Sequence, residues 1–349
     1  MSTVKGYAAN TVKAPLTPYT FDRREPRPGD VVIDIHHCGI CHSDIHQARD
    51  EWGGSIFPMV PGHEIAGKVI AVGSGVQKFK VGDTVGVGCM VDSCGKCEAC
   101  RAGLQQYCEK GCVYTYNSRE YDGEPTMGGY SERVVVDEKF VVKIPSNLSL
   151  AGAAPLLCAG ITMYSPLKHW NAGPNKRVAI LGLGGLGHMG VKIAHALGAE
   201  VTVLSHSMRK EQDARRMGAD HFGATSDEET FKKQANSFDL ILNTVSAEID
   251  WNAYLNLLRL DGSMVVVGLP GVNASIAPGM LLRNRRSVAG SMIGGISETQ
   301  EMLDFCGKHS IECDIEKIPV QQVNEAYERI LKSDVRYRFV IDMASLKAS

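Results

Sequence analysis

A glycine-rich turn restricts the fold of this chain of 349 residues more than any other feature of its sequence. The stretch "RVAILGLGGLGHMGVKIAHALGAEVTVL" holds Gly182, Gly184 and Gly187 in the pattern G-x-G-x-x-G, between an apolar run and a helical pattern. The first glycine permits a tight turn, the second lets the backbone approach a pyrophosphate, and the third allows the helix to pack on the strand. The stretch therefore predicts the strand, turn and helix of a dinucleotide-binding unit.

Strand-like and helix-like segments alternate around this turn, from about residue 150 to 290. Such alternation predicts βαβ units and a doubly wound parallel sheet. The expected strands are "RVAIL", "EVTVL", "FDLILNT", "GSMVVVG" and "SVAGSM". From about residue 30 to 145, short β-rich runs separated by Gly, Pro and Asp turns predict an irregular, barrel-like β domain. The last 55 or so residues fit either domain by pattern alone.

Four cysteines, Cys94, Cys97, Cys100 and Cys108, follow the spacing C-x2-C-x2-C-x7-C. Four thiolates complete a tetrahedral Zn2+ shell and leave no open position, which is typical of a structural site. A redox-active cysteine pair and an iron–sulfur site are the alternatives. A zinc finger for nucleic acid is disfavoured, because the loop carries as many acidic as basic residues.

Three further residues, Cys41, His63 and Cys158, are of the types that bind a catalytic zinc. Two thiolates and a neutral imidazole would leave one open position on Zn2+, which suits a Lewis acid. Spacing alone does not connect these three places, and each residue by itself is more often a core or surface group.

The end of the second expected strand indicates which dinucleotide binds. An NAD site usually places a carboxylate about twenty residues after the glycines, on the ribose 2′-hydroxyl. Here the strand ends in "SHSMRK", residues 205–210, with no carboxylate before Glu211. Hydroxyls followed by two cations favour a 2′-phosphate and predict NADP. Alternatively, Arg209 and Lys210 only begin a solvated helix.

Composition limits the function classes. The formal net charge of -2 at pH 7 gives no general attraction to nucleic acid or an anionic membrane. We find no signal peptide and no apolar stretch of about 18 residues, so a cytoplasmic protein without membrane contact is expected. Eleven cysteines in a reducing compartment favour metal ligation over disulfides. The basic run "LRNRR", residues 282–286, is expected to be a solvated turn.

The sequence resembles the zinc-dependent medium-chain alcohol dehydrogenases of the cinnamyl alcohol dehydrogenase group, and most of all the bacterial NADP-dependent broad-specificity aldehyde reductases. The likeness covers nearly the whole chain, through "GICHSD", "PMVPGHEIAG", the four-cysteine loop, "GGYSE", "APLLCAGITMYSPL", "GLGGLGHMGVKIA", "GSMIGGISETQEMLDFC" and "NEAYERILKSDVRYRFVID". It implies an α/β protein with a GroES-like catalytic domain (1–152 and 294–349) and a Rossmann domain (153–293). It also implies a homodimer.

The resemblance implies two zinc ions per chain, one structural and one catalytic. The catalytic zinc would be held by Cys41, His63 and Cys158, with Glu64 beside it. Asp44 would orient His63 through its second ring nitrogen.

The implied activity is the reversible reduction of an aldehyde to a primary alcohol by hydride transfer from NADPH. Ser43 would meet the substrate oxygen, and His46 would end a proton relay that passes through the cofactor ribose. A polyol or secondary-alcohol dehydrogenase, a zinc-free quinone or enoyl reductase, and a non-enzymatic zinc protein are the alternatives.

The resemblance also implies two groups of contact residues. The residues expected to contact NADP(H) are His42, Thr162, Gly182, Gly184, Gly185, Leu186, Gly187, Ser205, Ser207, Lys210, Ser291 and Arg338. The mostly apolar residues expected to line the substrate pocket are Trp52, Cys89, Tyr114, Met292 and Ile293. Such a pocket suits aromatic or medium aliphatic aldehydes.

Overall fold

The computed structural model describes residues 2–269 and 273–347. The chain forms two compact units, each of which is described by itself. Unit 1 comprises Met1–Ile161 and Gly294–Ser349, and unit 2 comprises Thr162–Ile293. The boundary after the first segment of unit 1 lies nine residues beyond the one that the sequence suggested, because the helical stretch after residue 150 packs first on unit 1.

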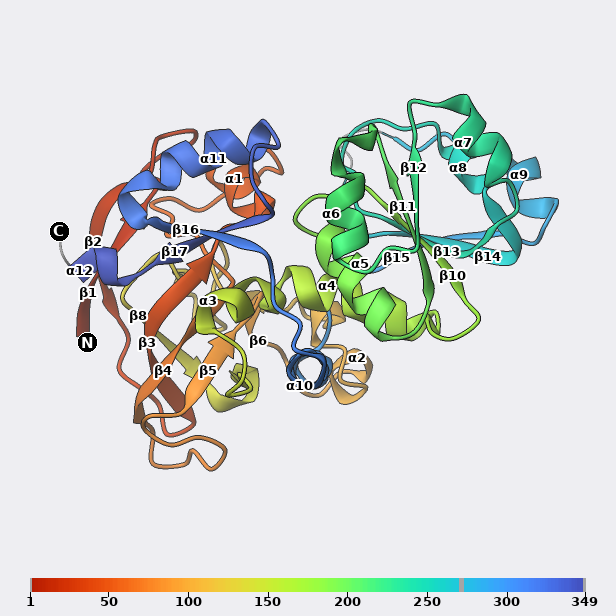
Figure 1. Ribbon diagram of the computed structural model, residues 1–349. Helices are drawn as coiled ribbons and strands as arrows, with labels where there is room; N and C mark the ends of the chain where they lie inside the picture. Colours follow the sequence, from red (N-terminus) through yellow and green to blue (C-terminus); the bar gives the residue numbers. More distant parts are fainter. Residues whose placement is uncertain (1, 270–272, 348–349) are drawn as a thin grey trace. The chain divides into compact units, whose positions relative to one another are not determined.

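Unit 1 is built on a mainly antiparallel sheet of seven strands (Figure 1). Its strands, in sheet order, are β16 (Ile315–Pro319), β17 (Arg338–Asp342), β3 (Asp30–Gly39), β4 (Ile65–Val72), β5 (Thr84–Val87) and β9 (Val142–Lys143), with β8 (Arg133–Asp137) also paired to β3. Two smaller antiparallel pairs are β1 (Ser2–Ala8) with β2 (Thr17–Arg23), and β6 (Met90–Asp92) with β7 (Val113–Tyr114). This irregular arrangement confirms the predicted β domain.

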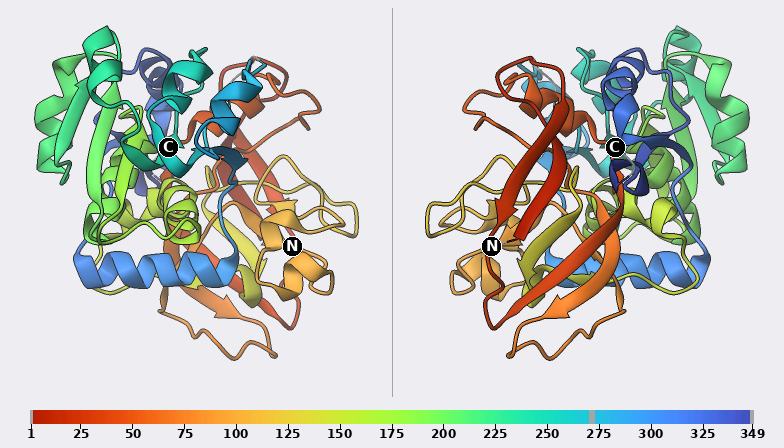
Figure 2. Two further views of the ribbon diagram at one scale, coloured as in Figure 1. Left: turned by 90° about the vertical axis from the view of Figure 1, so that its right-hand side faces the viewer. Right: turned by 90° about the vertical axis from the view of Figure 1, so that its left-hand side faces the viewer.

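Strands β3 and β4 bring two distant motifs together. They are the long neighbouring strands of the sheet in Figure 2, and they pair with Cys38 opposite Ile65. Because the pair is antiparallel, the end of β3 meets the start of β4. The residues just after β3 and just before β4 therefore come together at one end of the sheet. Strand β17 adds to the same place, since its Val340 pairs with Gly39.

The helices of unit 1 are short, apart from α10. They are α1 (His42–Ala48), α2 (Glu98–Arg101), α3 (Leu150–Ala153), α10 (Ile296–His309), α11 (Val323–Leu331) and α12 (Ala344–Lys347), with the 3-10 turns η1 (Gln105–Tyr107), η2 (Glu138–Phe140), η3 (Ala154–Leu157) and η5 (Val320–Gln322). The helix α4 (Ala159–His169) begins in unit 1 and continues into unit 2. Turn η3 packs on β3, β4 and β5, which places the residue that follows it beside the sheet.

Unit 2 is built on a six-stranded parallel sheet in the order β12-β11-β10-β13-β14-β15. The strands are β10 (Arg177–Leu181), β11 (Glu200–Ser205), β12 (His221–Ala224), β13 (Phe238–Asn243), β14 (Leu258–Val266) and β15 (Ser287–Gly290). This order, 3-2-1-4-5-6 when the strands are counted from β10, is that of the Rossmann fold, so the predicted fold class is confirmed. The sequence missed β12, which has four residues and an exposed histidine at its start.

Helices cover both faces of this sheet. They are α5 (Gly187–Ala196), α6 (Glu211–Arg216), α7 (Glu228–Lys233), α8 (Trp251–Leu255) and α9 (Pro278–Leu282), with the turn η4 (Met208–Lys210). Figure 1 shows α5 and α6 on one side of the strands and α7, α8 and α9 on the other. Trp251, Tyr254 and Leu255 of α8 are buried in one core cluster with residues of β10, β13 and β14.

The run "LRNRR" differs from its expected form. Leu282 is 81% exposed, as a solvated turn requires, but Arg286 is only 5% exposed. Its guanidinium donates hydrogen bonds to the carbonyls of Leu258 and Met280 and to the side chain of Asn236. Arg286 is therefore a buried residue that hydrogen-bonds to its surroundings just before β15. The expectation that it is solvated was wrong.

No single described helix is long and apolar enough to cross a membrane. One bent pair, Leu150–Leu157 with Ala159–His169, passes the same test by length and composition only, and most of its residues are buried.

Candidate active site and metal centres

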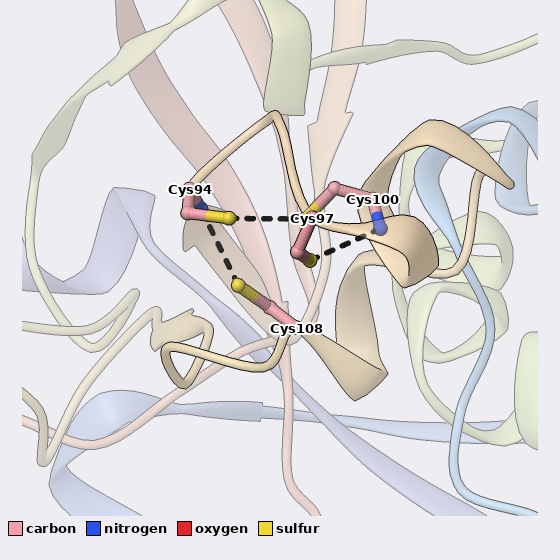
Figure 3. A group of neighbouring side chains, drawn as sticks. All are labelled: Cys94, Cys97, Cys100 and Cys108. Atoms are coloured by element: carbon pink, nitrogen blue, oxygen red, sulfur yellow. Dashed lines mark hydrogen bonds between the residues drawn. The ribbon is translucent and has the colours of Figure 1, made fainter.

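The four-cysteine loop gathers its thiols around one point, as Figure 3 shows. The Sγ atoms of Cys94, Cys97, Cys100 and Cys108 all lie within 4.8 Å of one another. The backbone N–H of Cys100 donates to Cys97 Sγ (3.4 Å), and that of Cys94 donates to Cys108 Sγ (3.4 Å). Backbone N–H groups also lower the pKa of Cys94 and Cys97, which favours thiolates. Four such sulfurs fit a tetrahedral metal ion with no open position.

A second cluster lies where β3 ends and β4 begins. One ligand atom from each of Cys41, His63, Glu64 and Cys158 lies within 4.8 Å of the others, and all four residues are buried. Cys41 and Cys158 approach with 3.9 Å between their Sγ atoms. The antiparallel strands supply Cys41 and His63, and Cys158 follows η3. The fold therefore brings together three places that spacing alone did not connect.

The local sequence "CHSD" explains how Cys41 is aimed. Cys41 is the N-cap of α1, and its backbone N–H donates to the carboxylate of Asp44 (2.9 Å). This contact satisfies one of the free donors at the helix start. The same carboxylate faces His63 Nδ1 at 3.3 Å and is fully buried. One acidic side chain thus orients both a thiol and an imidazole, and it leaves Nε2 of His63 for a metal.

Neighbouring charges and hydrogen bonds shift the pKa values of residues in the second cluster. Burial alone would lower the pKa of His63, but the negative charges of Cys89 and Asp44 raise it well above its ordinary value. A hydrogen bond with Cys158 is the largest cause that lowers the pKa of Cys41. A divalent cation would complete this electron-rich donor set by binding the thiolate and the neutral imidazole.

Glu64 and Arg338 form a buried ion pair next to these ligands. Burial raises the pKa of Glu64 to about 8, and the charge of Arg338 opposes that rise. A Cβ on Gly39 would lie 1.9 Å from Glu64 Oε2, so glycine is needed there to leave room for the carboxylate. Among the described residues, Glu64 Oε2 and Arg338 Nε are buried without a hydrogen-bond partner. An unpaired carboxylate oxygen beside two thiols and an imidazole also fits a metal ion.

The residues expected to move protons lie on α1 and the loop after it. Ser43 Oγ lies 3.6 Å from Cys41 Sγ. The ring of His46 is stacked between those of His42 (5.1 Å between centroids) and Trp52 (4.9 Å). Its Nδ1 contacts the carboxylate of Glu51. Glu51 was not predicted from the sequence, although an acidic residue five positions after a relay histidine was an available signal.

The predicted pocket residues fall in both units. Cys89 is half-buried, and its pKa is lowered first by a hydrogen bond with Cys158, which places its thiol at the second cluster. Trp52 and Tyr114 are 44% and 41% exposed. Met292 and Ile293 end unit 2, where Met292 is exposed and Ile293 has a φ of +40°. The common pocket stays a prediction.

The glycine turn of unit 2 has the form that its sequence predicts. Gly182 follows β10 and has a φ of +91°, a conformation that favours glycine. A Cβ on Gly187 would lie 2.0 Å from the carbonyl oxygen of Gly182, so α5 can pack on the turn only without a side chain. A Cβ on Gly184 would meet nothing within 4 Å. The turn therefore leaves open space at Gly184, next to the start of α5, where a pyrophosphate would bind.

Several other residues predicted to contact NADP(H) lie near this turn or at strand ends in unit 2. Ser205 ends β11, and Ser207 is the N-cap of η4. Lys210 Nζ donates to the carbonyl of Leu183 (2.7 Å), which brings a cation back to the glycine turn. Ser291 follows β15, and Thr162 is buried in α4.

The remaining predicted contacts lie beside these features. Gly185 and Leu186 form the end of the turn, with Leu186 as the N-cap of α5. Arg338, in unit 1, is paired with Glu64, and its contact with a cofactor stays a prediction.

The fold and the two cysteine clusters define a zinc-type oxidoreductase. The sequence matches the family described as alcohol dehydrogenase GroES-like domain over residues 27–146, and the one described as zinc-binding dehydrogenase over residues 185–308. The chain belongs to the zinc-binding alcohol dehydrogenase family, which confirms the resemblance found in the sequence.

Its relatives match over the full length of the chain. It is 61% identical to NADP-dependent alcohol dehydrogenase C 1 of Mycolicibacterium smegmatis, over 100% of both chains. It is 52% identical to the aldehyde reductase YahK of Escherichia coli, over 98% of this chain and 99% of that one. A solved cinnamyl alcohol dehydrogenase from Sorghum bicolor is 46% identical to this chain and superposes with a TM-score of 0.95. The match covers 98% of each chain.

Proposed function

We propose that this enzyme reduces aldehydes to primary alcohols, reversibly, with NADPH as the hydride donor. The observation that carries the proposal is the buried cluster of Cys41, His63 and Cys158, with the hydroxyl of Ser43 3.6 Å from Cys41 Sγ. A metal-binding group beside a proton donor is what reduction of a carbonyl requires. The names of the relatives, an alcohol dehydrogenase and an aldehyde reductase, support the same reaction class.

Cys41, His63 and Cys158 would hold the catalytic zinc, and Asp44 would keep His63 in the tautomer that binds it. When bound, zinc would polarise the substrate oxygen, and the nicotinamide would supply the hydride. Glu64 belongs to the same cluster, and its carboxylate pairs with Arg338. This pairing keeps the carboxylate beside the metal-binding residues while its charge is offset.

Ser43 and His46 would handle the proton. Ser43 Oγ would donate a proton to the substrate oxygen, and His46 would replace it from the solvent side. The contact of Glu51 with His46 Nδ1 leaves Nε2 as the second proton site on that ring. Stacking on His42 and Trp52 holds the ring in one plane while the proton moves.

The end of β11 supports NADP as the cofactor. Ser205, Ser207 and Lys210 offer two hydroxyls and a cation, and no carboxylate stands there to repel a 2′-phosphate. The hydrogen bond from Lys210 to Leu183 keeps that cation next to the glycine turn. The name of the Mycolicibacterium smegmatis relative, at 61% identity, points to the same cofactor.

A second zinc, bound by the four-cysteine loop, would brace unit 1. The loop contacts the start of α10, where the backbone N–H of Ile296 donates to Gln105 Oε1 (3.2 Å). Gly103 and Gly295 also meet there, since a Cβ on Gly295 would lie 1.7 Å from the carbonyl oxygen of Gly103. A metal that fixes the loop would therefore hold the start of α10.

The substrate would be an uncharged aldehyde, aromatic or aliphatic of medium length. Trp52, Cys89 and Tyr114 in unit 1, with Met292 and Ile293 in unit 2, are proposed to line the pocket. Their side chains carry no charge that would call for a charged substrate. A polyol, with several hydroxyls to satisfy, fits this apolar set less well.

We propose a cytoplasmic homodimer. Strand β15 ends the order of the parallel sheet, and an open strand edge is a common place for two copies to pair. Two leucines near this edge are exposed. Leu260 of β14 is 62% exposed, and Leu282 at the end of α9 is 81% exposed. All eleven cysteines are free of disulfides, as a reducing compartment requires.

The test is the initial rate of NADPH oxidation with benzaldehyde, compared with NADH and with metal-stripped enzyme. We expect turnover with NADPH, at least about tenfold slower turnover with NADH, and none without metal. Turnover that survives metal removal would favour a zinc-free reductase on the same scaffold. Absence of turnover with either nucleotide, in protein that holds zinc, would contradict the proposal.

A further inference from the structure

Three buried tyrosines lie near Asp44. Tyr116, Tyr130 and Tyr327 are 6%, 0% and 5% exposed, and Asp44 has no exposed surface. Burial raises the pKa of all three phenols well above its ordinary value, and the charge of Asp44 raises it further. The three hydroxyls therefore stay protonated and can act as hydrogen-bond donors. None of the proposed catalytic steps uses them.

The hydroxyl of Tyr130 donates to Asp44 Oδ2 at 3.0 Å. The other carboxylate oxygen, Oδ1, faces His63 Nδ1 at 3.3 Å. The backbone N–H groups of Cys41 and Gly62 also donate to Asp44, at 2.9 Å and 3.2 Å. These donors replace the water that a buried carboxylate loses. Tyr130, Asp44 and His63 thus form one buried chain that ends at a proposed zinc ligand.

The backbone places Tyr130 against the segment that carries His63. Its N–H donates to the carbonyl of Pro61 (2.9 Å), and the N–H of Gly129 donates to the carbonyl of Gly62 (2.9 Å). A Cβ on Gly128 would lie 2.3 Å from the oxygen of Pro61, so the close approach requires the two glycines of "GGYSE". Gly62 has a φ of +105° and no room for a Cβ beside the ring of Tyr130.

A partly buried arginine, Arg23, also holds the segment that carries Tyr130. Arg23 donates hydrogen bonds to the carbonyls of Met127 (2.7 Å), Gly128 (3.0 Å) and Arg133 (2.9 Å). Arg23 ends β2, so the segment of Tyr130 is hydrogen-bonded both to β2 and to the segment of His63. Rigid support of an outer hydrogen-bonding group is what the orientation of a metal ligand needs.

We infer that Tyr130 is a positioning residue for the catalytic metal: its hydroxyl holds Asp44 so that His63 keeps a proton on Nδ1 and presents Nε2. The inference rests on the proposed binding of zinc by Cys41, His63 and Cys158. Tyr130 touches neither the substrate nor the metal-binding atoms. Its effect should therefore appear in metal affinity and in the geometry of the site.

The experiment compares wild type, Tyr130→Phe and the control Tyr254→Phe. The control also removes one buried tyrosine hydroxyl, but in unit 2, where Tyr254 is 6% exposed. Zinc transfer to a coloured chelator and the absorption spectrum of the cobalt(II)-substituted proteins are measured. We expect Tyr130→Phe to bind one of its two ions about 10–100-fold more weakly and to show a changed cobalt spectrum. The control should match wild type.

The outcomes separate this inference from the proposed function. If wild type holds two ions and Tyr130→Phe holds both equally tightly, with an unchanged cobalt spectrum, the inference is overturned and the proposed function stands. If wild type binds no more ions than a Cys41→Ala variant does, the proposed metal site fails, and the inference fails with it.

A second pair of variants tests whether the effect of Tyr130 passes through Asp44. An amide at position 44 carries no charge that needs the hydroxyl, so Asp44→Asn and Asp44→Asn/Tyr130→Phe should bind the metal equally weakly. A double variant that loses a further 10-fold or more in affinity would show that Tyr130 acts independently of Asp44, and would overturn the inference.

Discussion

Cys158 contributes a thiol to the second cluster, although it lies 117 residues after Cys41 in the sequence. We predict that Cys158→Ala will lower turnover by more than about 10³-fold, because a ligand is lost and several kcal/mol of charge stabilisation in the transition state go with it. NADPH binding should persist, since the glycine turn belongs to unit 2. Steady-state rates, nucleotide fluorescence titration and zinc content measure the three effects.

Cys306→Ala is the matched control for this prediction. Cys306 is also a fully buried cysteine of unit 1, but it lies on α10 next to Met302, outside both cysteine clusters. It should keep two zinc ions and near-native turnover. A Cys158→Ala enzyme that worked as fast as the Cys306→Ala enzyme would refute the assignment of Cys158 as a ligand.

At the scale of the element, two glycines of the turn between β10 and α5 have different roles: Gly187 permits packing, and Gly184 leaves room for the cofactor. Gly187→Ala places a methyl group 2.0 Å from the oxygen of Gly182, so we predict a loss of about 1–3 kcal/mol in the free energy of unfolding. Gly184→Ala meets open space and should leave stability within about 0.5 kcal/mol of wild type. Its methyl group would instead obstruct the pyrophosphate and raise the KM for NADPH. Denaturant unfolding and nucleotide kinetics distinguish the two.

The two variants serve as controls for each other. A stable Gly187→Ala protein would mean that α5 does not need the close approach that the structure shows. A Gly184→Ala protein with an unchanged KM for NADPH would mean that the pyrophosphate binds elsewhere.

At the scale of the whole molecule, the chain forms two compact units. We therefore predict that zinc stabilises one unit and that NADPH stabilises the other. Removing zinc should lower the thermal transition of unit 1, which contains both cysteine clusters. NADPH at 100 times its Kd should stabilise the unit that binds it by about 2.7 kcal/mol. Differential scanning calorimetry with and without chelator, and with and without NADPH, tests this. A single transition that both treatments shift equally would contradict independent units.

Much of the fold could be predicted because its signals are local. The glycine turn, the five expected strands of the parallel sheet and the four-cysteine loop each lie within a short stretch of chain. Residues that are close in sequence are close in space whatever the rest of the fold does. Strand β12 escaped prediction because four residues, one of them glycine, do not make a clear alternating pattern.

The candidate site was harder to predict from the sequence, because its contacts join distant segments. Tyr130 and Asp44 are 86 residues apart, and Glu64 and Arg338 are 274 residues apart. The sequence contained "GGYSE" as a family motif, but nothing in it showed that its tyrosine would reach Asp44. Arg286 similarly sits in a basic run that is exposed at Leu282, and only the packing around β14 buries it.

The sequence by itself determined the two kinds of unit, the glycine turn and the tetrahedral spacing of four cysteines, because backbone sterics and ligand spacing act over a few residues. Tertiary structure alone decided that Cys41, His63 and Cys158 meet, that the last strand joins β3, and that a tyrosine supports the acid behind the histidine. These contacts depend on the pairing of β3 with β4 and β17, and strand pairing is set by the packing of the whole unit.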